Sequence, residues 1–301
     1  MADLKIGVVG LDTSHVEAFI KLINYDDQKY HVPGGRIIGA FPGGSQQVEL
    51  SRSRVGKYTD AYRDEHKVRI YDSIEALCKD VDAVLLHSVD GRQHLEQFDV
   101  ISRAGKPVFI DKPLACSTAD SRAIARLAAE RGAPVMSCSA IRYAKGVAGL
   151  VGADQKVGSA EVFGPMAILD DYPPYYWYGV HSADVLYAYL GAGCRSVQAF
   201  HTDDADLMVG LWEDGRIGTV RGLRLGAWQF GCTLFTKDGA VHSVQASEPP
   251  AYAGLIEKVM PFFQTGRAPI DIEETVEVMA FLEAAETSMA EGGRAVELPN
   301  A

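Results

Sequence analysis

The stretch Gly105-Lys106-Pro107-Val108-Phe109-Ile110-Asp111-Lys112-Pro113-Leu114-Ala115 decides how the first half of the chain is interpreted. Its short apolar run, 107–110, predicts a buried strand. Pro113 disfavours helical geometry at Lys112, so we expect the ammonium to lie on extended backbone just past the carboxyl end of that strand. Ligands of open parallel sheets bind at this edge. Lys112 is therefore a candidate for holding a substrate oxygen or relaying a proton, although the tripeptide alone favours a surface lysine beside a turn.

Strand and helix patterns alternate on both sides of this stretch. Further strands are expected at 5–9, 36–41, 68–71, 81–86 and 134–139, with helical patterns between them. This alternation is typical of a parallel sheet with helices on both faces. Ser14 and Glu17 form a capping-box pattern at the start of the first helix.

From about Ile141 the pattern changes. A helix at 179–190 precedes strand patterns at 196–200, 208–212, 217–223, 230–236 and 240–244, and helices are expected at 252–265 and 272–291. Asp214-Gly215 and Asp238-Gly239 supply the positive φ angles that hairpin turns need. We therefore expect an α/β protein with a Rossmann-like doubly wound domain over 1–140. An α+β domain with a mainly antiparallel open sheet would occupy 141–301.

Composition limits the class of partner. A length of 301 residues suits two domains at about 150 residues each. A net charge of −11 argues against nucleic acid or an anionic membrane surface as a ligand. No signal-peptide pattern and no apolar run of about 20 residues is present. Five scattered cysteines are typical of a reducing compartment, so we predict a cytoplasmic protein without a metal site.

At this point the chain resembles the glucose–fructose oxidoreductase/inositol dehydrogenase/MocA (Gfo/Idh/MocA) family over nearly its whole length. The segment 5–10 looks like the family's first strand and first turn glycine, and 105–115 matches its Gly-Lys-x-Val-x-x-Glu-Lys-Pro-Leu-Ala motif, with Asp111 in place of Glu. His94 and Arg142 fall where the family has a histidine and an arginine. The segment 181–184, His-Ser-Ala-Asp, matches its His-x-x-Asp helix.

The resemblance implies hydride transfer between a nicotinamide and a carbon of a sugar, polyol or related hydroxy compound in the interdomain cleft. It assigns Lys112 to the reacting oxygen and His181 to proton exchange, a role that an unperturbed pKa of about 6.5 suits. Asp184 lies one helical turn after His181 and would orient the imidazole or grip a hydroxyl. The alternative is that His181 is a core histidine satisfied by Asp184.

NAD or NADP is the cofactor that the resemblance implies. Two positions depart from the family pattern. Asp12 replaces the second fingerprint glycine, so its carboxylate would repel a pyrophosphate by ~1 to 4 kcal/mol per charge pair, or would occupy the first helix's N-terminus as a structural cap with Ser14. Phe41 stands where an acid would bind the ribose. We therefore expect the dinucleotide to bind weakly, in a shifted position or not at all. The residues predicted to contact it are Gly10, Asp12, Ser14, His15, Phe41, Ser88, Asp90, His94, Asp111, Lys112 and Arg142.

The aromatic segment 170–178 would provide an aromatic surface against which a sugar ring packs. Tyr175, Tyr176 and Trp177 are the predicted substrate residues, together with His181 and Asp184. The same rings would also fit an aromatic plug in the interdomain core or a subunit interface. Trp177 stands where the family often has an aspartate, so either the proton relay is rerouted or redox chemistry has been lost.

The sequence therefore leaves two hypotheses about function and one about the oligomeric state. The first function is an NAD(P)-dependent dehydrogenase. The second is a cofactor-degenerate family member that binds a carbohydrate-like ligand or a partner without redox catalysis. Because one sheet face in the second domain would stay open and apolar, with Leu211, Val220 and part of Phe230, we expect a homodimer or a dimer of dimers.

Overall fold

The computed structural model describes residues 3–152, 154–246 and 251–299. The chain forms two compact units. Unit 1 comprises Met1–Ala115, Ala119–Ser137 and Leu255–Ile272, and unit 2 comprises Cys116–Thr118, Cys138–Gly254 and Glu273–Ala301. The chain thus returns to unit 1 late in the sequence, and a boundary at 140/141 stays a prediction about independently folding domains.

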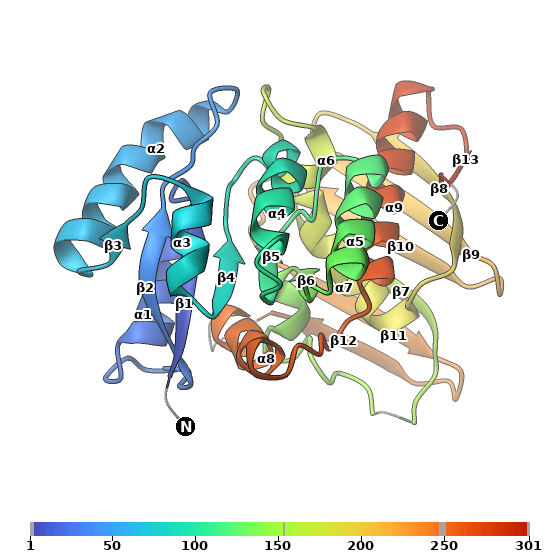
Figure 1. The fold of residues 1–301 in the computed structure, drawn as a ribbon. Helices are drawn as coiled ribbons and strands as arrows, with labels where there is room; N and C mark the ends of the chain where they lie inside the picture. The colour runs from blue at the N-terminus through green and yellow to red at the C-terminus, as the bar shows by residue number, and fades with distance from the viewer. Residues whose placement is uncertain (1–2, 153, 247–250, 300–301) are drawn as a thin grey trace. The chain divides into compact units, whose positions relative to one another are not determined.

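Unit 1 is built on a six-stranded parallel sheet, and this confirms the Rossmann-like prediction (Figure 1). The strand order is β3-β2-β1-β4-β5-β6. The strands are β1 (Leu4–Val9), β2 (Gly35–Phe41), β3 (Arg69–Ile70), β4 (Ala83–Leu86), β5 (Val108–Asp111) and β6 (Val135–Cys138). Because β1 lies between β2 and β4, the order reverses there, which places a ligand crevice beyond the carboxyl ends of these strands.

Helices follow the strands of this sheet as the periodicity predicts. They are α1 (His15–Asn24), α2 (Glu49–Asp60) with the π-helical turn η1 (Ala61–Glu65), α3 (Ile74–Asp80), η2 (Gly91–Gln93), α4 (His94–Ser102) and α5 (Thr118–Arg131). The capping box at Ser14 is wrong, because Ser14 has helical φ and ψ and its side chain makes no capping bond. A capping side chain needs extended backbone, as at Ser73, which accepts a 3.1 Å bond from the N–H of Ala76.

Unit 2 contains a seven-stranded sheet in the order β12-β11-β7-β10-β9-β8-β13. The strands are β7 (Val157–Pro165), β8 (Cys194–His201), β9 (Ala205–Trp212), β10 (Ile217–Leu223), β11 (Gly231–Thr236), β12 (Val241–Gln245) and β13 (Val296–Glu297). The mainly antiparallel prediction is confirmed. The sequence missed β7, a central strand that pairs in parallel with β10 and antiparallel with β11.

The remaining helices are η3 (Ala140–Tyr143), α6 (Pro174–Trp177), α7 (Gly179–Leu190), α8 (Ala251–Thr265) and α9 (Ile272–Ala290). Helix α7 covers one face of the sheet of unit 2, since a Cβ at Gly218 would lie 2.6 Å from Leu190 and 2.8 Å from Leu186. Among the described residues, no helix combines the length and the apolar character needed to cross a bilayer.

The opposite face of the same sheet carries exposed apolar side chains. Side chains alternate between the faces of a strand, so Val220, which is fully buried, shares the α7 side with Gly218. Its predicted place on the open face is therefore wrong. Ile217 and Phe235, which are 47% and 37% exposed, belong to that face instead.

Candidate functional site

Three loops of unit 1 meet beyond the carboxyl ends of β1, β2 and β4. Gly10 follows β1 with φ of 91°, and a Cβ there would lie 2.3 Å from the backbone nitrogen of Ser88. The N–H of Leu11 donates a 2.7 Å bond to the carbonyl of Pro42. Only glycine fits at position 10, because any side chain would collide with the loop after β4.

Asp12 fastens these loops together. Its carboxylate is fully buried and accepts a 2.7 Å bond from the hydroxyl of Ser51 and a 3.0 Å bond from the N–H of Val89. Burial raises the pKa of Asp12, while these two hydrogen bonds act in the opposite direction. The carboxylate therefore points into unit 1, where it bonds the start of α2 and the loop after β4. This arrangement argues against the predicted repulsion of a pyrophosphate and against the predicted cap of α1.

Several other predicted cofactor residues also hold the loops. His94 is fully buried, with Nε2 2.8 Å from the carbonyl of Ser88 and Nδ1 2.9 Å from the carbonyl of Pro113. Burial alone would raise the pKa of Asp90, but bonds from Arg92 and Ser45 bring it below its ordinary value. His94 and Asp90 thus hold the loops of unit 1 together, and direct contact of either residue with the cofactor stays a prediction.

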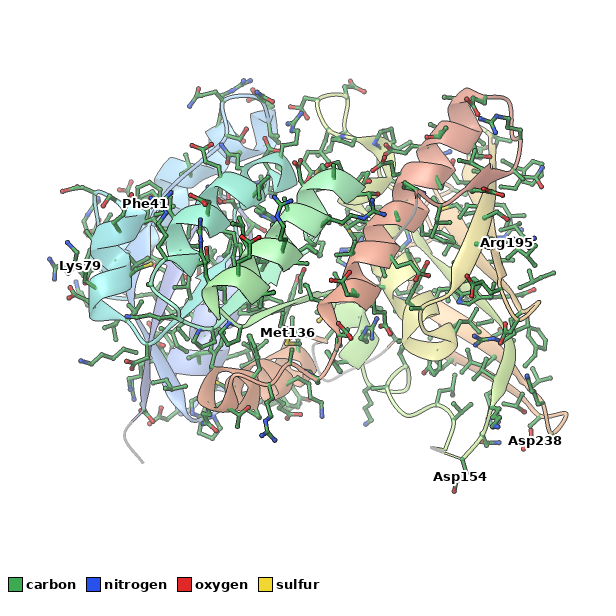
Figure 2. The ribbon with its side chains drawn as sticks, turned by 45° about the vertical axis from the view of Figure 1, so that its right-hand side comes forward. Phe41, Lys79, Met136, Asp154, Arg195 and Asp238 are labelled. Atoms are coloured by element: carbon green, nitrogen blue, oxygen red, sulfur yellow. The ribbon has the colours of Figure 1, made fainter. Side chains whose placement is uncertain are left out.

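The surface of the crevice comes from fewer residues. Ser14 is exposed, and Phe41, which ends β2, is half-buried (Figure 2). The hydroxyl of Ser88 is buried and has no hydrogen-bond partner among the described residues. Ser88 thus offers a polar atom at the point where the order of the strands reverses.

A cluster of two histidines and an aspartate lies at the same edge of the sheet. Asp111 ends β5 and is buried, and its Oδ2 lies 2.5 Å from Nδ1 of His15 and 3.1 Å from Nδ1 of His87. Burial by itself would raise the pKa of Asp111, but the two histidines hold it well below its usual range. The sequence missed His87, although its position directly after β4 was a signal.

Lys112 lies where the sequence predicted, directly after β5. Its side chain is half-buried, its backbone N–H donates a 2.9 Å bond to Oδ1 of Asp111, and its peptide bond to Pro113 is cis. The lysine is thus attached to a rigid strand end at the edge of the sheet where ligands of this fold bind.

The other predicted catalytic residues belong to unit 2. Nδ1 of His181 lies 2.7 Å from the hydroxyl of Ser139, and the N–H of Ser139 donates a 3.1 Å bond to Asp184. Arg142 binds Asp184 through Nε and Nη2, both at 3.1 Å, and binds Glu274 at 2.8 Å. Ser139 therefore connects the histidine with the aspartate, a link that the sequence did not predict.

This ion-pair network bears on the roles predicted for Asp184 and Arg142. The side chain of Asp184 is 2% exposed and is paired with Arg142, so it is not available to grip a substrate hydroxyl. Arg142, predicted to bind the cofactor, serves two carboxylates instead. Burial opposes its charge, but Asp184 and Glu274 keep the pKa of Arg142 above its ordinary value.

The aromatic segment is mainly a plug in unit 2. Tyr175 and Tyr176 are 0% and 1% exposed, and their hydroxyls donate to Asp206 at 2.9 Å and to the carbonyl of Met279 at 3.2 Å. Both rings are thus buried within unit 2, which favours the aromatic plug, and direct contact with a substrate stays a prediction. Trp177 is half-buried and packs edge-to-face on Tyr172, with centroids 5.8 Å apart.

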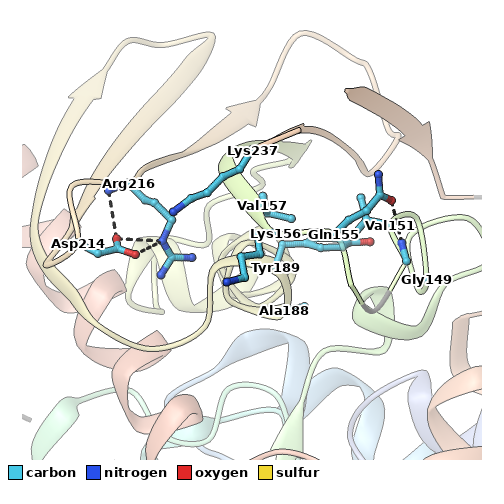
Figure 3. Close-up of a pocket in the computed structure, with 11 residues that line it drawn as sticks. Gly149, Val151, Gln155, Lys156, Val157, Ala188, Tyr189, Asp214, Arg216 and Lys237 are labelled. Atoms are coloured by element: carbon cyan, nitrogen blue, oxygen red, sulfur yellow. Dashed lines mark hydrogen bonds and ion pairs between the residues drawn. The ribbon is translucent and has the colours of Figure 1, made fainter. Parts of the chain in front are cut away.

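A hollow with a volume of about 590 Å³ also lies in unit 2 (Figure 3). Its lining includes the basic side chains of Lys156, Arg216 and Lys237, and Arg216 is bound to Asp214 at 2.7 Å. None of the predicted site residues lines this hollow. It therefore has no link to the predicted reaction.

Comparisons with known proteins agree with this geometry. Residues 4–138 match the Gfo/Idh/MocA family model, which describes an oxidoreductase family with an NAD-binding Rossmann fold. A comparison with curated proteins gave no match.

Solved structures with the same fold cover the whole chain. GenD2 from gentamicin A biosynthesis, in complex with NAD, is 18% identical with a TM-score of 0.80, over 100% of this chain and 97% of its own. Myo-inositol dehydrogenase from Lactobacillus casei, in complex with NAD(H) and myo-inositol, is 14% identical with a TM-score of 0.76, over 100% and 98%. Myo-inositol 2-dehydrogenase from Lactobacillus plantarum is 14% identical with a TM-score of 0.76, over 99% and 100%.

Proposed function

Since residues 4–138 belong to the Gfo/Idh/MocA oxidoreductase family, we propose that this protein is an NAD(P)-dependent dehydrogenase acting on a CH–OH group. Its substrate would be a sugar, a polyol or a related hydroxy compound. The observation that carries the proposal is the half-buried Lys112 directly after β5, in a sheet of order β3-β2-β1-β4-β5-β6. Structures of the same fold hold NAD and, in one case, myo-inositol, which supports this class of substrate.

The residues of the crevice fit a dinucleotide. Gly10 leaves no side chain in the turn after β1, Ser88 offers an unpartnered hydroxyl beside it, and the charge of Asp12 is turned inward. Ser14 and the first turn of α1 would face the pyrophosphate, because a helix N-terminus attracts anions. When bound, the nicotinamide would supply the hydride acceptor or donor.

The chain's own residues would bind the reacting alcohol and move its proton. The Lys112 ammonium would hold the substrate oxygen and stabilise negative charge that develops on it. His181 would exchange the proton through Nε2, because Ser139 bonds Nδ1 and fixes the ring. Asp184 would act only through Ser139 and Arg142, as a positioning residue.

Replacing Lys112 tests the proposal. With a panel of sugars and polyols and NAD or NADP, Lys112→Ala should lower kcat by roughly 100-fold to 1,000-fold. Dinucleotide affinity, measured by nicotinamide fluorescence, should stay close to that of the unmodified protein. The exposed Lys79, labelled in Figure 2, provides the matched control Lys79→Ala. Undiminished turnover in Lys112→Ala would contradict the assignment.

The second candidate is a binding protein without redox activity. It is favoured by two sequence features, Phe41 in place of the ribose acid and His15 in place of the third fingerprint glycine. Titration of the purified protein with NADH and NADPH separates the candidates. Binding of neither dinucleotide at millimolar concentration would leave ligand binding without hydride transfer as the better description.

A further inference from the structure

The His15–His87–Asp111 cluster brings three metal-ligating atoms to one point in unit 1. One donor atom from each residue lies within 4.8 Å of the other two. The Nδ1 atoms of both imidazoles approach the same carboxylate oxygen, at 2.5 and 3.1 Å. Two imidazoles and a carboxylate that converge on one point are a typical donor set for a divalent transition metal.

The backbone holds each donor in place. His15 begins α1, His87 directly follows β4, and Asp111 ends β5, so all three lie at one edge of the parallel sheet. The N–H of Lys112 occupies Oδ1 of Asp111 and leaves Oδ2 directed at the histidines. Sites on strand ends and helix starts are held more precisely than sites on long loops.

Burial in the cluster is graded. The side chain of His87 is 0% exposed, that of Asp111 is 9% exposed and that of His15 is 14% exposed. An ion would therefore enter from the His15 side.

The distances suit zinc after a small adjustment. Zinc binds imidazole nitrogen at about 2.0–2.1 Å and carboxylate oxygen at about 2.0–2.2 Å, which puts ligand atoms of a tetrahedral site roughly 3.3 Å apart. The two nitrogen–oxygen distances of 2.5 and 3.1 Å would each open by less than 1 Å. Rotation of the His15 side chain, the most exposed of the three, would provide most of that movement.

We propose that His15, His87 and Asp111 bind a divalent transition-metal ion, with Zn²⁺ as the best match. Three protein ligands leave a fourth position for water or for an oxygen of a small molecule. This site goes beyond the proposed dehydrogenase and beyond the sequence prediction, which named no metal. It does not depend on the dinucleotide.

Metal titration of the full-length protein tests the proposal. After treatment with a chelator, Zn²⁺ binding is measured by calorimetry and Co²⁺ binding by visible absorption, whose d–d bands report coordination geometry. We expect one ion per chain and the strong Co²⁺ bands of a four-coordinate site. His15→Ala and Asp111→Asn should each weaken binding by more than about 100-fold, the upper range for loss of a supporting residue.

A second histidine–aspartate pair supplies the control. Nδ1 of His201 lies 2.7 Å from Asp206 in unit 2. The other side chains bonded to that carboxylate, among the residues that the structure describes, are Tyr175 and Arg224, so no second imidazole is present there. His201→Ala should leave metal binding unchanged, and circular dichroism should show that each variant remains folded.

The outcomes separate this inference from the proposed function. Absence of stoichiometric Zn²⁺ binding, or binding that survives both His15→Ala and Asp111→Asn, would show that the cluster is a metal-free hydrogen-bonded triad. Loss of binding in His201→Ala would overturn the assignment as well. Failure to bind NADH or NADPH would contradict the dehydrogenase while leaving the metal result intact.

Discussion

Replacement of Asp12 tests how the loops of unit 1 are held. Asp12→Ala removes the acceptor of the Ser51 hydroxyl and of the Val89 N–H in a fully buried place. Each unsatisfied buried donor costs about 1–3 kcal/mol, and removing a buried carboxylate offsets part of this sum. We therefore expect the free energy of unfolding to fall by about 2–4 kcal/mol at neutral pH.

The pH dependence of this loss has a definite sign. Burial raises the pKa of Asp12 above its ordinary value of 3.8, so the folded protein binds the proton more tightly than the unfolded chain does. The stability that this residue contributes is fully present below about pH 3.8 and declines as pH rises through the raised pKa. The difference between the unmodified protein and Asp12→Ala should therefore be larger at pH 4.5 than at pH 8.

Urea unfolding at several pH values provides the measurement. Asp27→Asn, at an exposed aspartate of the same unit, is the matched control and should change stability by less than about 0.5 kcal/mol. A double-mutant cycle with Ser51→Ala should give a coupling energy of about 1 kcal/mol or more. A loss no larger than that of Asp27→Asn, or a loss that grows with pH, would refute the reasoning.

A different substitution at the same position, Asp12→Gly, tests the effect of this residue on cofactor binding. The sequence alone predicted that Asp12→Gly would tighten dinucleotide binding by relieving charge repulsion. Because the carboxylate is turned inward, Asp12→Gly should change the dissociation constants for NAD and NADP by no more than about twofold. A twofold change corresponds to ~0.4 kcal/mol of binding free energy. Calorimetric titration measures this, with circular dichroism to check that the variant is folded at the temperature used, and a tenfold gain in affinity would support charge repulsion by Asp12.

Three further substitutions have defined outcomes. Arg142→Ala leaves the buried Asp184 and the half-buried Glu274 uncompensated, so the free energy of unfolding should fall by about 3–5 kcal/mol. A loss below about 1 kcal/mol in urea unfolding would contradict the pairing. Tyr175→Phe removes one hydrogen bond to Asp206, so the free energy of unfolding should fall by about 1 kcal/mol while KM stays unchanged. A raised KM would indicate that Tyr175 contacts the substrate. Phe235→Lys places a charge on the open sheet face, so the expected dimer should dissociate in sedimentation at micromolar concentration, and a dimer that persists would place the interface elsewhere.

Short-range pattern in the sequence determined most of the secondary structure. The strand at 217–223 and the helix at 179–190 have the predicted bounds, and the glycines of the two Asp-Gly turns have φ of 84° and 89°. Such features depend on neighbours only a few residues away, so periodicity and turn chemistry reveal them. The position of Lys112 directly after β5 was predicted in the same way, because an apolar strand pattern followed by Lys-Pro indicates where the strand ends.

Tertiary structure alone decided what the charged side chains do. Asp12 bonds residues 39 and 77 positions away, Asp111 bonds a histidine 96 positions away, and Arg142 bonds Glu274 across 132 positions. The partner of a buried charge is set by which loops the sheet brings to one edge, and no local pattern encodes that. The family motif placed Asp111 and Asp184 in the right elements, but the choice of His15, His87 and Arg142 as their partners follows from burial, because a carboxylate removed from water must find the nearest compensating group.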